Sequence, residues 1–196
     1  MPRAFVAVLL DEQTRRAVAA QIDRLRPLSR VVAWVPSHNL HLTLRFLGDQ
    51  TEEQLAEVVP ALEEAAAGVP PFTLSLRGLG GFPGLDHPRT LWVGVSGGAQ
   101  EVRRLQAHVA EALERRGVSI EARAWQAHVT IGRVTDEKRG RGEGMPELRS
   151  ALMRGAAASF GTMLVASIAL MRSDLYTSGS RYTGIASVPL ASESGV

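Results

Sequence analysis

The sequence contains no cysteine and only one lysine, Lys138, among its 196 residues. Without cysteine the chain can form neither disulfides nor thiolate zinc sites, and a cysteine nucleophile is excluded as well. A chain without disulfides is most simply placed in the cytoplasm. The formal net charge is only +2, so charge alone gives no evidence for a polyanionic partner. Arginine binds phosphate well, but we attribute its excess over lysine to codon bias.

Long apolar runs are also absent. The first apolar segment, Phe5–Leu10, is followed directly by Asp11 and Glu12, so it is too short for a membrane span or a signal peptide. We interpret this segment as a first β-strand and expect no association with membranes. Because 45% of the residues are hydrophobic, a chain of this length can bury a substantial core, as one domain or as two packed lobes.

Hydrophobic periodicity and turn residues predict a mixture of strands and helices. The predicted strands are Phe5–Leu10, Val32–Val35, Leu40–Leu47, Phe72–Leu79, Thr90–Val95, Ala127–Val134, Met163–Met171 and Tyr182–Pro189. The predicted helices are Glu12–Leu25, Thr51–Ala67, Ala99–Arg116 and Pro146–Ala157, with Thr51 as the N-cap of a capping box. Within the charged, glycine-rich run Asp136–Gly144, we interpret Arg139–Glu143 as a solvated loop that serves as a connection. This order is not that of a Rossmann fold.

Two of the predicted strands carry a His-x-Thr motif, formed by His41 with Thr43 and by His128 with Thr130. Side chains two residues apart on a strand share a face, so each motif presents an imidazole beside a hydroxyl. One such motif is weak evidence, because threonine favours strands and most single histidines are structural. Two motifs that use two of only five histidines indicate a joint role.

The second motif follows the first after 87 residues, and the same offset aligns Arg3–Val8 with Thr90–Val95. Strand, helix and motif therefore occur in the same order twice, over approximately residues 3–88 and 89–190. This repeat predicts an α+β fold, with residues 1–196 forming a single domain of two pseudo-symmetric lobes. Each lobe should be an antiparallel sheet with helices on its outer face. The polar strand faces should meet in an active groove between the lobes.

Two facing imidazoles form an acid and base pair near neutral pH, because the unperturbed histidine pKa is about 6.5. Such a pair is suited to in-line phosphoryl transfer: one imidazole deprotonates the attacking oxygen and the other protonates the leaving oxygen. The hydroxyls of Thr43 and Thr130 can donate hydrogen bonds to phosphate oxygens. This chemistry requires no metal and no cofactor. The residues alone do not assign which histidine is the acid.

A zinc site is the alternative, with His41 and His128 joined by a third histidine. The available residues for that third position are His38, His87 and His108. Neither a His-x-His nor a His-Glu-x-x-His spacing is present, and threonine is a poor zinc ligand but a good phosphate donor. We therefore favour the phosphate site.

The segments Asn39–Gly48 and His128–Arg133 resemble the two signature motifs of the two-histidine phosphoesterase superfamily. The likeness is greatest to the RNA 2′,3′-cyclic phosphodiesterases, also called 2′-5′ RNA ligases. It extends over essentially the whole chain, since Arg3–Ala7, Trp34–Pro36 and Ser173–Tyr182 also match. Two positions depart from the family pattern: Ala127 replaces a common proline and Gly132 a frequent alanine. Neither departure removes a reacting group, so we expect activity.

The resemblance implies that His41 is the proton donor to the leaving 3′ oxygen and that His128 is the base that activates water. The product would be a 2′-phosphate, and 2′-5′ ligation would be the reverse activity. Arg133 would bind phosphate or the RNA backbone. Arg45 shares a strand face with His41 and is a weaker candidate for the same role.

Among the aromatic residues that could stack a base, we select Trp125, three residues before His128. Trp34 and Tyr182 are other candidates, whereas Phe5 and Trp92 occupy equivalent positions in the repeat and are expected in the lobe cores. The expected partners are RNA ends or nucleotides with a 2′,3′-cyclic phosphate, and we expect a monomer without an obligate protein partner. Two other functions stay open: a non-catalytic RNA-end binding module, and a phosphoesterase for another small cyclic phosphate.

Overall fold

The computed structural model describes residues 3–118, 124–135, 145–177 and 179–191. The run Asp136–Gly144, which contains the loop interpreted above as a connection, lies outside these ranges. The strands are β1 (Arg3–Leu9), β2 (Val32–Trp34), β3 (His41–Asp49), β4 (Phe72–Phe82), β5 (Thr90–Gly97), β6 (His128–Val134), β7 (Ser159–Val165), β8 (Ser167–Tyr176) and β9 (Gly179–Pro189). The helices are α1 (Glu12–Leu25), α2 (Glu52–Ala67), α3 (Ala99–Arg115) and α4 (Met145–Arg154), with short 3₁₀ turns at Arg26–Leu28 and Ser37–Asn39.

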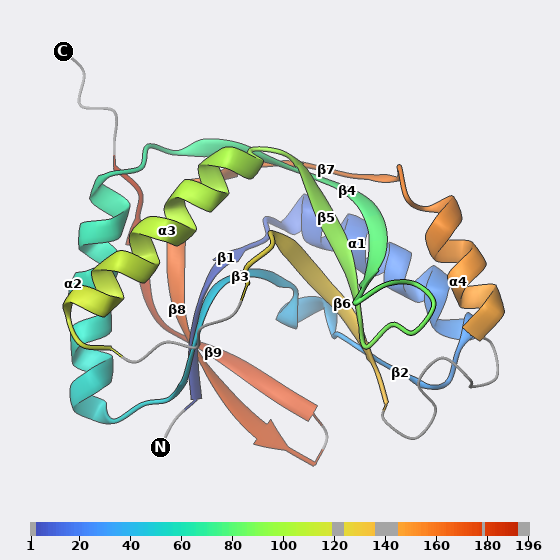
Figure 1. The fold of residues 1–196 in the computed structure, drawn as a ribbon, viewed down its shortest axis with the longest axis horizontal. Coiled ribbons are helices and arrows are strands. Elements are labelled where there is room, and N and C mark those ends of the chain that lie inside the picture. The colour runs from blue at the N-terminus through green and yellow to red at the C-terminus, as the bar shows by residue number, and fades with distance from the viewer. Residues whose placement is uncertain (1–2, 119–123, 136–144, 178, 192–196) are drawn as a thin grey trace.

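The strands form one antiparallel sheet with two arms (Figure 1). One arm has the order β9, β8, β1, β3, and the other has the order β6, β5, β4, β7, with β2 paired to the edge of β6. The arms join where β3 meets β6, and within the described residues these two strands pair only at Leu42 and Val129. The sheet therefore bends at its centre, and the two predicted pseudo-symmetric lobes are its two arms.

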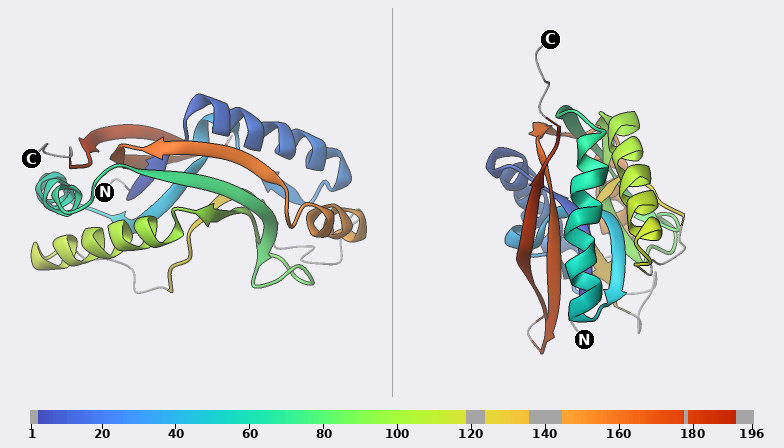
Figure 2. Two further views of the ribbon diagram at one scale, coloured as in Figure 1. Left: turned by 90° about the horizontal axis from the view of Figure 1, so that it is seen from above. Right: turned by 90° about the vertical axis from the view of Figure 1, so that its left-hand side faces the viewer.

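Helices cover the outer face of both arms, as the fold class predicted. The helices α2 and α3 pack on each other, with α2 also against β8 and β9 and α3 against β3 (Figure 2). On the other side of the molecule, α1 packs on β7 and α4 packs on β4. The capping box is confirmed: Gln54 N–H donates to Thr51 Oγ1 and Thr51 N–H donates to the Gln54 side chain.

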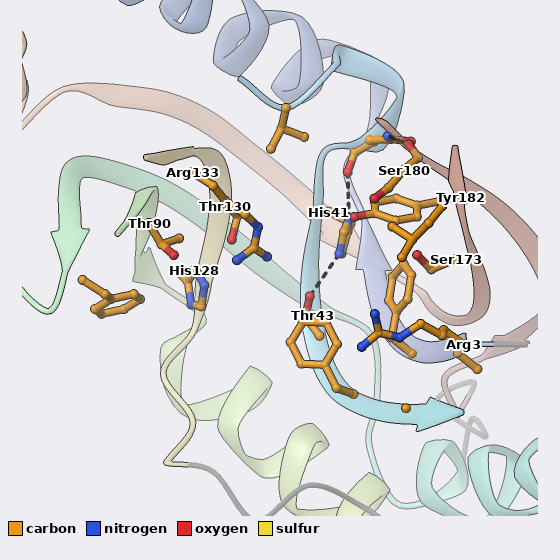
Figure 3. A pocket seen from close by; sticks show the side chains of 18 residues that line it. Arg3, His41, Thr43, Thr90, His128, Thr130, Arg133, Ser173, Ser180 and Tyr182 are labelled. Carbon is orange, nitrogen blue, oxygen red and sulfur yellow. Dashed lines mark hydrogen bonds between the residues drawn. The ribbon is translucent and has the colours of Figure 1, made fainter. Parts of the chain in front are cut away.

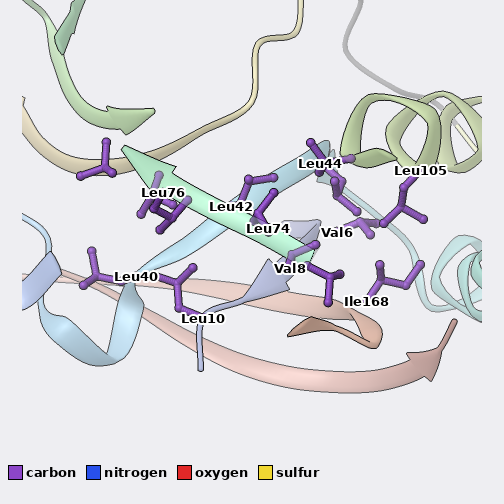
Figure 4. Packing of buried hydrophobic residues seen from close by; sticks show 14 of the residues in the cluster. Val6, Val8, Leu10, Leu40, Leu42, Leu44, Leu74, Leu76, Leu105 and Ile168 are labelled. Carbon is purple, nitrogen blue, oxygen red and sulfur yellow. The ribbon is translucent and has the colours of Figure 1, made fainter. Parts of the chain in front are cut away.

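Apolar and polar side chains alternate along β3 and β6, so one face of the sheet is apolar and the other is polar. Leu42 and Leu44 of β3 are fully buried under the helices, as are Val129 and Ile131 of β6. They join a single apolar core with residues of β1, β4 and α3 (Figure 4). The side chains between them point to the opposite, concave face. Burial of one face of each strand thus fixes which face carries the His-x-Thr motifs.

One predicted strand, Met163–Met171, is wrong in extent. The chain instead turns a corner at Ala166, so that β7 pairs with β4 in one arm and β8 pairs with β1 and β9 in the other. The corner carries neither glycine nor proline, and its Ala166 carbonyl is satisfied by the Leu190 N–H at 2.9 Å. The segment Met163–Met171 is apolar except for Ser167, so the break was not apparent in the sequence. The last strand also begins earlier than predicted, at Gly179.

The arms do not coincide with the two halves of the sequence. Strand β4, from the first half, lies beside β5 of the second, and β8 of the second half lies beside β1 of the first. Each arm is therefore completed by the other half of the chain. We propose on this ground that the chain is a single bilobal domain, because neither repeat could form its sheet alone. Within the described ranges, no helix combines the length and apolar character needed to cross a membrane.

We expect Leu42→Ala to lower the free energy of unfolding by about 2 to 5 kcal/mol, because it leaves a cavity where the two arms join. Urea denaturation would measure the change. The matched control is Leu164→Ala in β7, where the leucine is 63% exposed, and the loss should stay below about 1 kcal/mol. Equal effects of the two substitutions would contradict the assignment of Leu42 to the core.

Candidate active site

The single bridge between β3 and β6 arranges both motifs around one point. Leu42 pairs with Val129 in antiparallel register, so each bridging residue is preceded by a histidine and followed by a threonine. Antiparallel pairing sets His41 across from Thr130 and Thr43 across from His128. Because the two strands do not continue their ladder beyond this pair, these four side chains line a groove instead of packing as cross-strand neighbours.

The groove has a volume of about 330 Å³ and is lined by both histidines and both threonines. Figure 3 shows His41 and Thr43 on one side, His128 and Thr130 on the other, and Arg133 between them. The convergence predicted from the sequence is therefore found. The groove also contains residues of β8 and β9, which form its wall on the His41 side.

His41 is held from several directions. Its Nδ1 lies 2.7 Å from the Asn39 carbonyl oxygen and its Nε2 lies 3.0 Å from Thr43 Oγ1. The ring centroid of Phe5 is 4.7 Å away, and the ring of Tyr182 packs edge to face at 5.3 Å. These contacts fix the orientation of the imidazole plane.

His128 has a related but more open environment. Its Nδ1 lies 2.7 Å from the Gln126 carbonyl oxygen, which repeats the contact of His41 with the residue two positions before it. The Phe82 ring packs edge to face at 5.0 Å. Among the described residues, no threonine hydroxyl is bonded to His128 Nε2, so this nitrogen faces the groove.

The hydrogen bonds determine the tautomer of both histidines. A carbonyl oxygen only accepts, so Nδ1 must carry the proton in His41 and in His128. In the neutral imidazole Nε2 is then the acceptor, and in His41 it receives the hydrogen bond of the Thr43 hydroxyl. Both rings therefore use Nε2 as the nitrogen that gains or loses a proton.

Burial lowers the pKa of His41, and the charges of Arg133 and His128 lower it further, against the opposing effect of the Asn39 carbonyl. Burial also lowers the pKa of His128, where the Gln126 carbonyl opposes and the Arg133 charge reinforces the shift. The Arg133 guanidinium therefore lies close enough to act on both imidazoles. In the empty groove both rings favour the neutral form.

The other predicted site residues separate into two places. Arg133 lines the groove. Arg45 and Trp125 do not; they line a second, adjoining pocket of about 460 Å³ that shares His128 and Thr43 with the groove. The indole Nε1–H of Trp125 donates to the Thr43 carbonyl at 3.0 Å.

Gly132, one of the two departures from the family pattern, has a local cause. Strand β2 crosses so closely that a Cβ atom at position 132 would lie 2.7 Å from Val32 Cγ1. An alanine would therefore require the side chains of Val32 and Trp34 to shift.

Phe5 lies in an apolar core, as predicted, although not in the main one. It is buried in a small cluster with Ala7, Ala169 and Met171 on the concave side, separate from the main core. Trp92, expected to be its counterpart, packs on Phe82 at 5.3 Å and covers Gly80. Phe5 therefore contacts His41 directly, and Trp92 packs on Phe82, which contacts His128. Hydrophobic periodicity alone could not distinguish these positions from ordinary core positions.

Sequence reasoning missed the residues that hold the histidines. Asn39 is 4% exposed; its carbonyl orients His41 and its Nδ2 donates to the Ser180 carbonyl at 2.8 Å. This bond ties β9 to the start of β3. Phe82, Ser173, Thr90 and Arg3 also line the groove. Of these residues, only Asn39 had a detectable signal in the sequence. It lies two residues before His41, as Gln126 lies two residues before His128.

A metal centre lacks a donor set in the described part of the chain, where no group of three His, Cys, Asp or Glu side chains is placed to hold an ion. His38 is exposed in the turn before β3, and His108 lies on α3. Neither of them lines the groove, and the exposed His87 does not line it either. The zinc alternative thus has no third histidine beside His41 and His128.

Residues 14–177 match the family model of the 2′-5′ RNA ligase superfamily. The chain belongs to the 2′-5′ RNA ligase superfamily. The RNA 2′,3′-cyclic phosphodiesterase of Aquifex aeolicus is 35% identical over 182 residues, which cover 92% of this chain and 93% of that protein. The enzyme of the same name from Archaeoglobus fulgidus is 36% identical over 180 residues, 92% of this chain and 96% of the relative. The predicted family is thereby confirmed.

Solved structures of this superfamily confirm the fold. A crystal structure of a Thermus thermophilus protein has a TM-score of 0.75 and 32% sequence identity, covering 97% of this chain and 99% of the other. Escherichia coli LigT in complex with 3′-AMP has a TM-score of 0.74 at 22% identity, with coverage of 97% and 99%. The second likeness concerns the fold alone.

In the empty groove we expect both imidazoles to titrate below the usual value of about 6.5, with the proton added at Nε2. ¹⁵N NMR would follow both nitrogens of each ring. Inorganic phosphate should raise both pKa values, because an anion in the groove stabilises the imidazolium forms. Proton uptake at Nδ1, or pKa values that do not respond to phosphate, would contradict the tautomers or the position of the anion.

Proposed function

We propose that this protein hydrolyses RNA and nucleotide 2′,3′-cyclic phosphodiesters to 2′-phosphomonoesters, with His41 as the general acid and His128 as the general base. The observation that carries the proposal is the convergence of two Nε2 atoms on one groove, each oriented by a carbonyl at Nδ1. The names of the relatives at 35% and 36% identity support this substrate.

The reaction needs one proton transfer on each side of the phosphorus atom. Neutral His128 takes a proton from water as the water oxygen attacks phosphorus, and the bond to the 3′ oxygen breaks as His41 donates its Nε2 proton to that oxygen. The 2′ oxygen keeps its bond to phosphorus, so the product is a 2′-phosphate. After proton exchange between the rings and solvent, the site is ready for another turn.

Thr43 couples the charge of His41 to phosphate binding. While His41 is neutral, its Nε2 accepts the Thr43 hydroxyl at 3.0 Å. Protonation of Nε2 turns this nitrogen into a donor, so the Thr43 hydroxyl proton becomes available to a phosphate oxygen. Thr130 offers the corresponding hydroxyl from β6. Both threonine hydroxyls can therefore donate to the phosphate when His41 is protonated, which is also the state in which His41 can act as an acid.

The unequal surroundings of the two histidines support these roles. His41 is more deeply enclosed, with Phe5 and Tyr182 against its ring. His128 is more accessible and borders the adjoining pocket. Water reaches the accessible ring, where a base is needed, while the enclosed ring meets the ribose oxygen.

Arg133 is proposed to supply the positive charge that binds the anion between the two imidazoles. By attracting the phosphate it brings in the negative charge that offsets the low pKa of His41. We also propose that the protein acts on RNA ends as a monomer in the cytoplasm, without metal or nucleotide cofactor. Ligation of 5′-hydroxyl RNA ends in 2′-5′ linkage is the same displacement with a 5′ hydroxyl in place of water, and cleavage of that linkage back to the cyclic phosphate is its reverse.

Hydrolysis of a 2′,3′-cyclic nucleotide in the presence of EDTA tests the function. We expect a 2′-phosphate as the only monoester, separated from the 3′ isomer by chromatography. A 3′-phosphate product would show that the 2′ oxygen leaves, and would contradict the proposed mechanism. Loss of activity in EDTA, restored by zinc, would favour the metal alternative.

Histidine variants provide the matched control. His41→Ala and His128→Ala should each lower kcat by at least about 100-fold, the usual contribution of a proton-transfer group. His38→Ala removes an exposed histidine only three residues from His41 and should stay within about twofold of the unmodified chain. Affinity for the cyclic nucleotide without any turnover would identify a non-catalytic binding module.

Arg133→Ala should raise KM about tenfold or more, since a charged hydrogen bond contributes about 1.5 to 3 kcal/mol. Removing the cation also removes an influence that lowers both imidazole pKa values. The whole bell-shaped profile of kcat/KM should therefore move to higher pH. Arg133→Lys keeps the charge but loses the fork, so its profile should shift less. An unmoved profile in Arg133→Ala would contradict the placement of this charge.

A further inference from the structure

The pocket that adjoins the groove at His128 is built mainly from flat and apolar side chains. Trp125, Phe46 and Phe82 form its walls, and Phe46, Phe82, Thr43 and His128 also line the groove. Its volume of about 460 Å³ lies within the usual range for small-ligand sites. The two cavities are therefore contiguous, and a ligand could extend from one into the other.

The aromatic wall is held in place. The Trp125 indole is tied to β3 by its 3.0 Å hydrogen bond to the Thr43 carbonyl, and Phe46 follows on the same strand with 44% of its surface exposed. A fixed, partly exposed indole is a suitable platform for a nucleobase, which stacks with little dependence on its identity. The Arg45 guanidinium, from the same strand, adds a cation to the lining.

Of the two cavities, His41 lines only the groove, whereas His128 lines both. His38 holds the position before His41 that Trp125 holds before His128, yet His38 is exposed and lines neither cavity. The His41 side is instead closed by Tyr182 and the β8–β9 hairpin. The pocket thus belongs to the half of the site in which the attacking oxygen is activated.

In-line displacement places the attacking and leaving oxygens on opposite sides of phosphorus. With His41 serving the leaving 3′ oxygen, the attacker approaches from the His128 side. Water occupies that position in hydrolysis. Any larger attacking alcohol must carry the rest of its structure away from phosphorus on the same side, where the adjoining pocket opens.

We propose that this pocket binds the base of an acceptor nucleoside whose 5′ hydroxyl takes the place of water. The proposal rests on the function proposed above. His128 removes the 5′ hydroxyl proton as that oxygen bonds to phosphorus, and the bond to the 3′ oxygen breaks with a proton from His41. The product is a 2′-5′ phosphodiester, and no further reactant is needed. Trp125 thereby stacks the base of the acceptor, not that of the cyclic nucleotide.

The proposed acceptor site is tested by comparing how the phosphoryl group is divided between water and an added alcohol. The protein is incubated with a 2′,3′-cyclic nucleotide and either adenosine or methanol, and transfer and hydrolysis products are separated by chromatography and mass spectrometry. Adenosine transfer should saturate with adenosine concentration, whereas methanol, too small to use the pocket, should give a product ratio that rises linearly. 5′-Deoxyadenosine should compete with adenosine while accepting nothing.

Two variants probe the pocket: Ala124→Tyr leaves every groove residue in place, whereas Trp125→Ala also removes the hydrogen bond to the Thr43 carbonyl. Ala124→Tyr places a ring in the pocket from an exposed position that does not line the groove. It should lower the ratio of adenosine transfer to hydrolysis by about 5-fold or more, as expected for loss of one stacking contact, while the methanol ratio stays within about twofold. Trp125→Ala should also lower adenosine transfer more than methanol transfer, and retained hydrolysis in Ala124→Tyr shows that this variant has folded.

The outcomes separate the two proposals. No 2′-phosphate from the unmodified protein would overturn the proposed function and this inference together. Hydrolysis with adenosine transfer that does not saturate, or that falls in parallel with methanol transfer in both variants, would overturn the acceptor pocket alone. Selective loss of adenosine transfer supports it.

Discussion

The site depends on the one point where β3 and β6 pair, between Leu42 and Val129. Both bridging side chains are completely buried, so the residues on either side of them must face the opposite surface of the sheet. Pairing at this single position brings two histidines and two threonines together, and the divergence of the strands keeps room for a phosphate. Core packing and active-site geometry are therefore set by the same two residues.

Much of this arrangement could be predicted from the sequence, because alternation in Leu40–Leu47 and the 87-residue offset are local or periodic signals. The exchange of β4 and β8 between the arms could not, since strand pairing over such separations leaves no periodic trace. The corner at Ala166 could not be predicted either, because the segment around it is apolar except for Ser167. The residue type of Asn39 gave no indication of its role, because the contact with His41 comes from its main-chain carbonyl, which every residue has; only its position before the histidine was informative.

Electrostatics in the groove explain why both imidazoles suit an enzyme that must bind before it reacts. Burial and the Arg133 charge keep the pKa values of both rings low while the groove is empty. A bound phosphodiester brings a negative charge next to these groups and favours the imidazolium form. In the proposed mechanism the acid thus becomes available when the substrate is present, and the hydrogen bond between His41 and Thr43 links this change to the phosphate donors.

Pseudo-symmetry gives the two halves of the site the same reacting groups, so it cannot by itself distinguish an acid from a base. The distinction must come from features that the repeat does not share. Tyr182 from β9 closes the His41 side, whereas Trp125 opens a lined pocket on the His128 side. The attacking oxygen must enter from solvent and exchange with other acceptors, while the leaving oxygen stays attached to the bound ribose. The open His128 side suits the attacking oxygen and the closed His41 side suits the leaving oxygen. This asymmetry therefore favours His128 as the base.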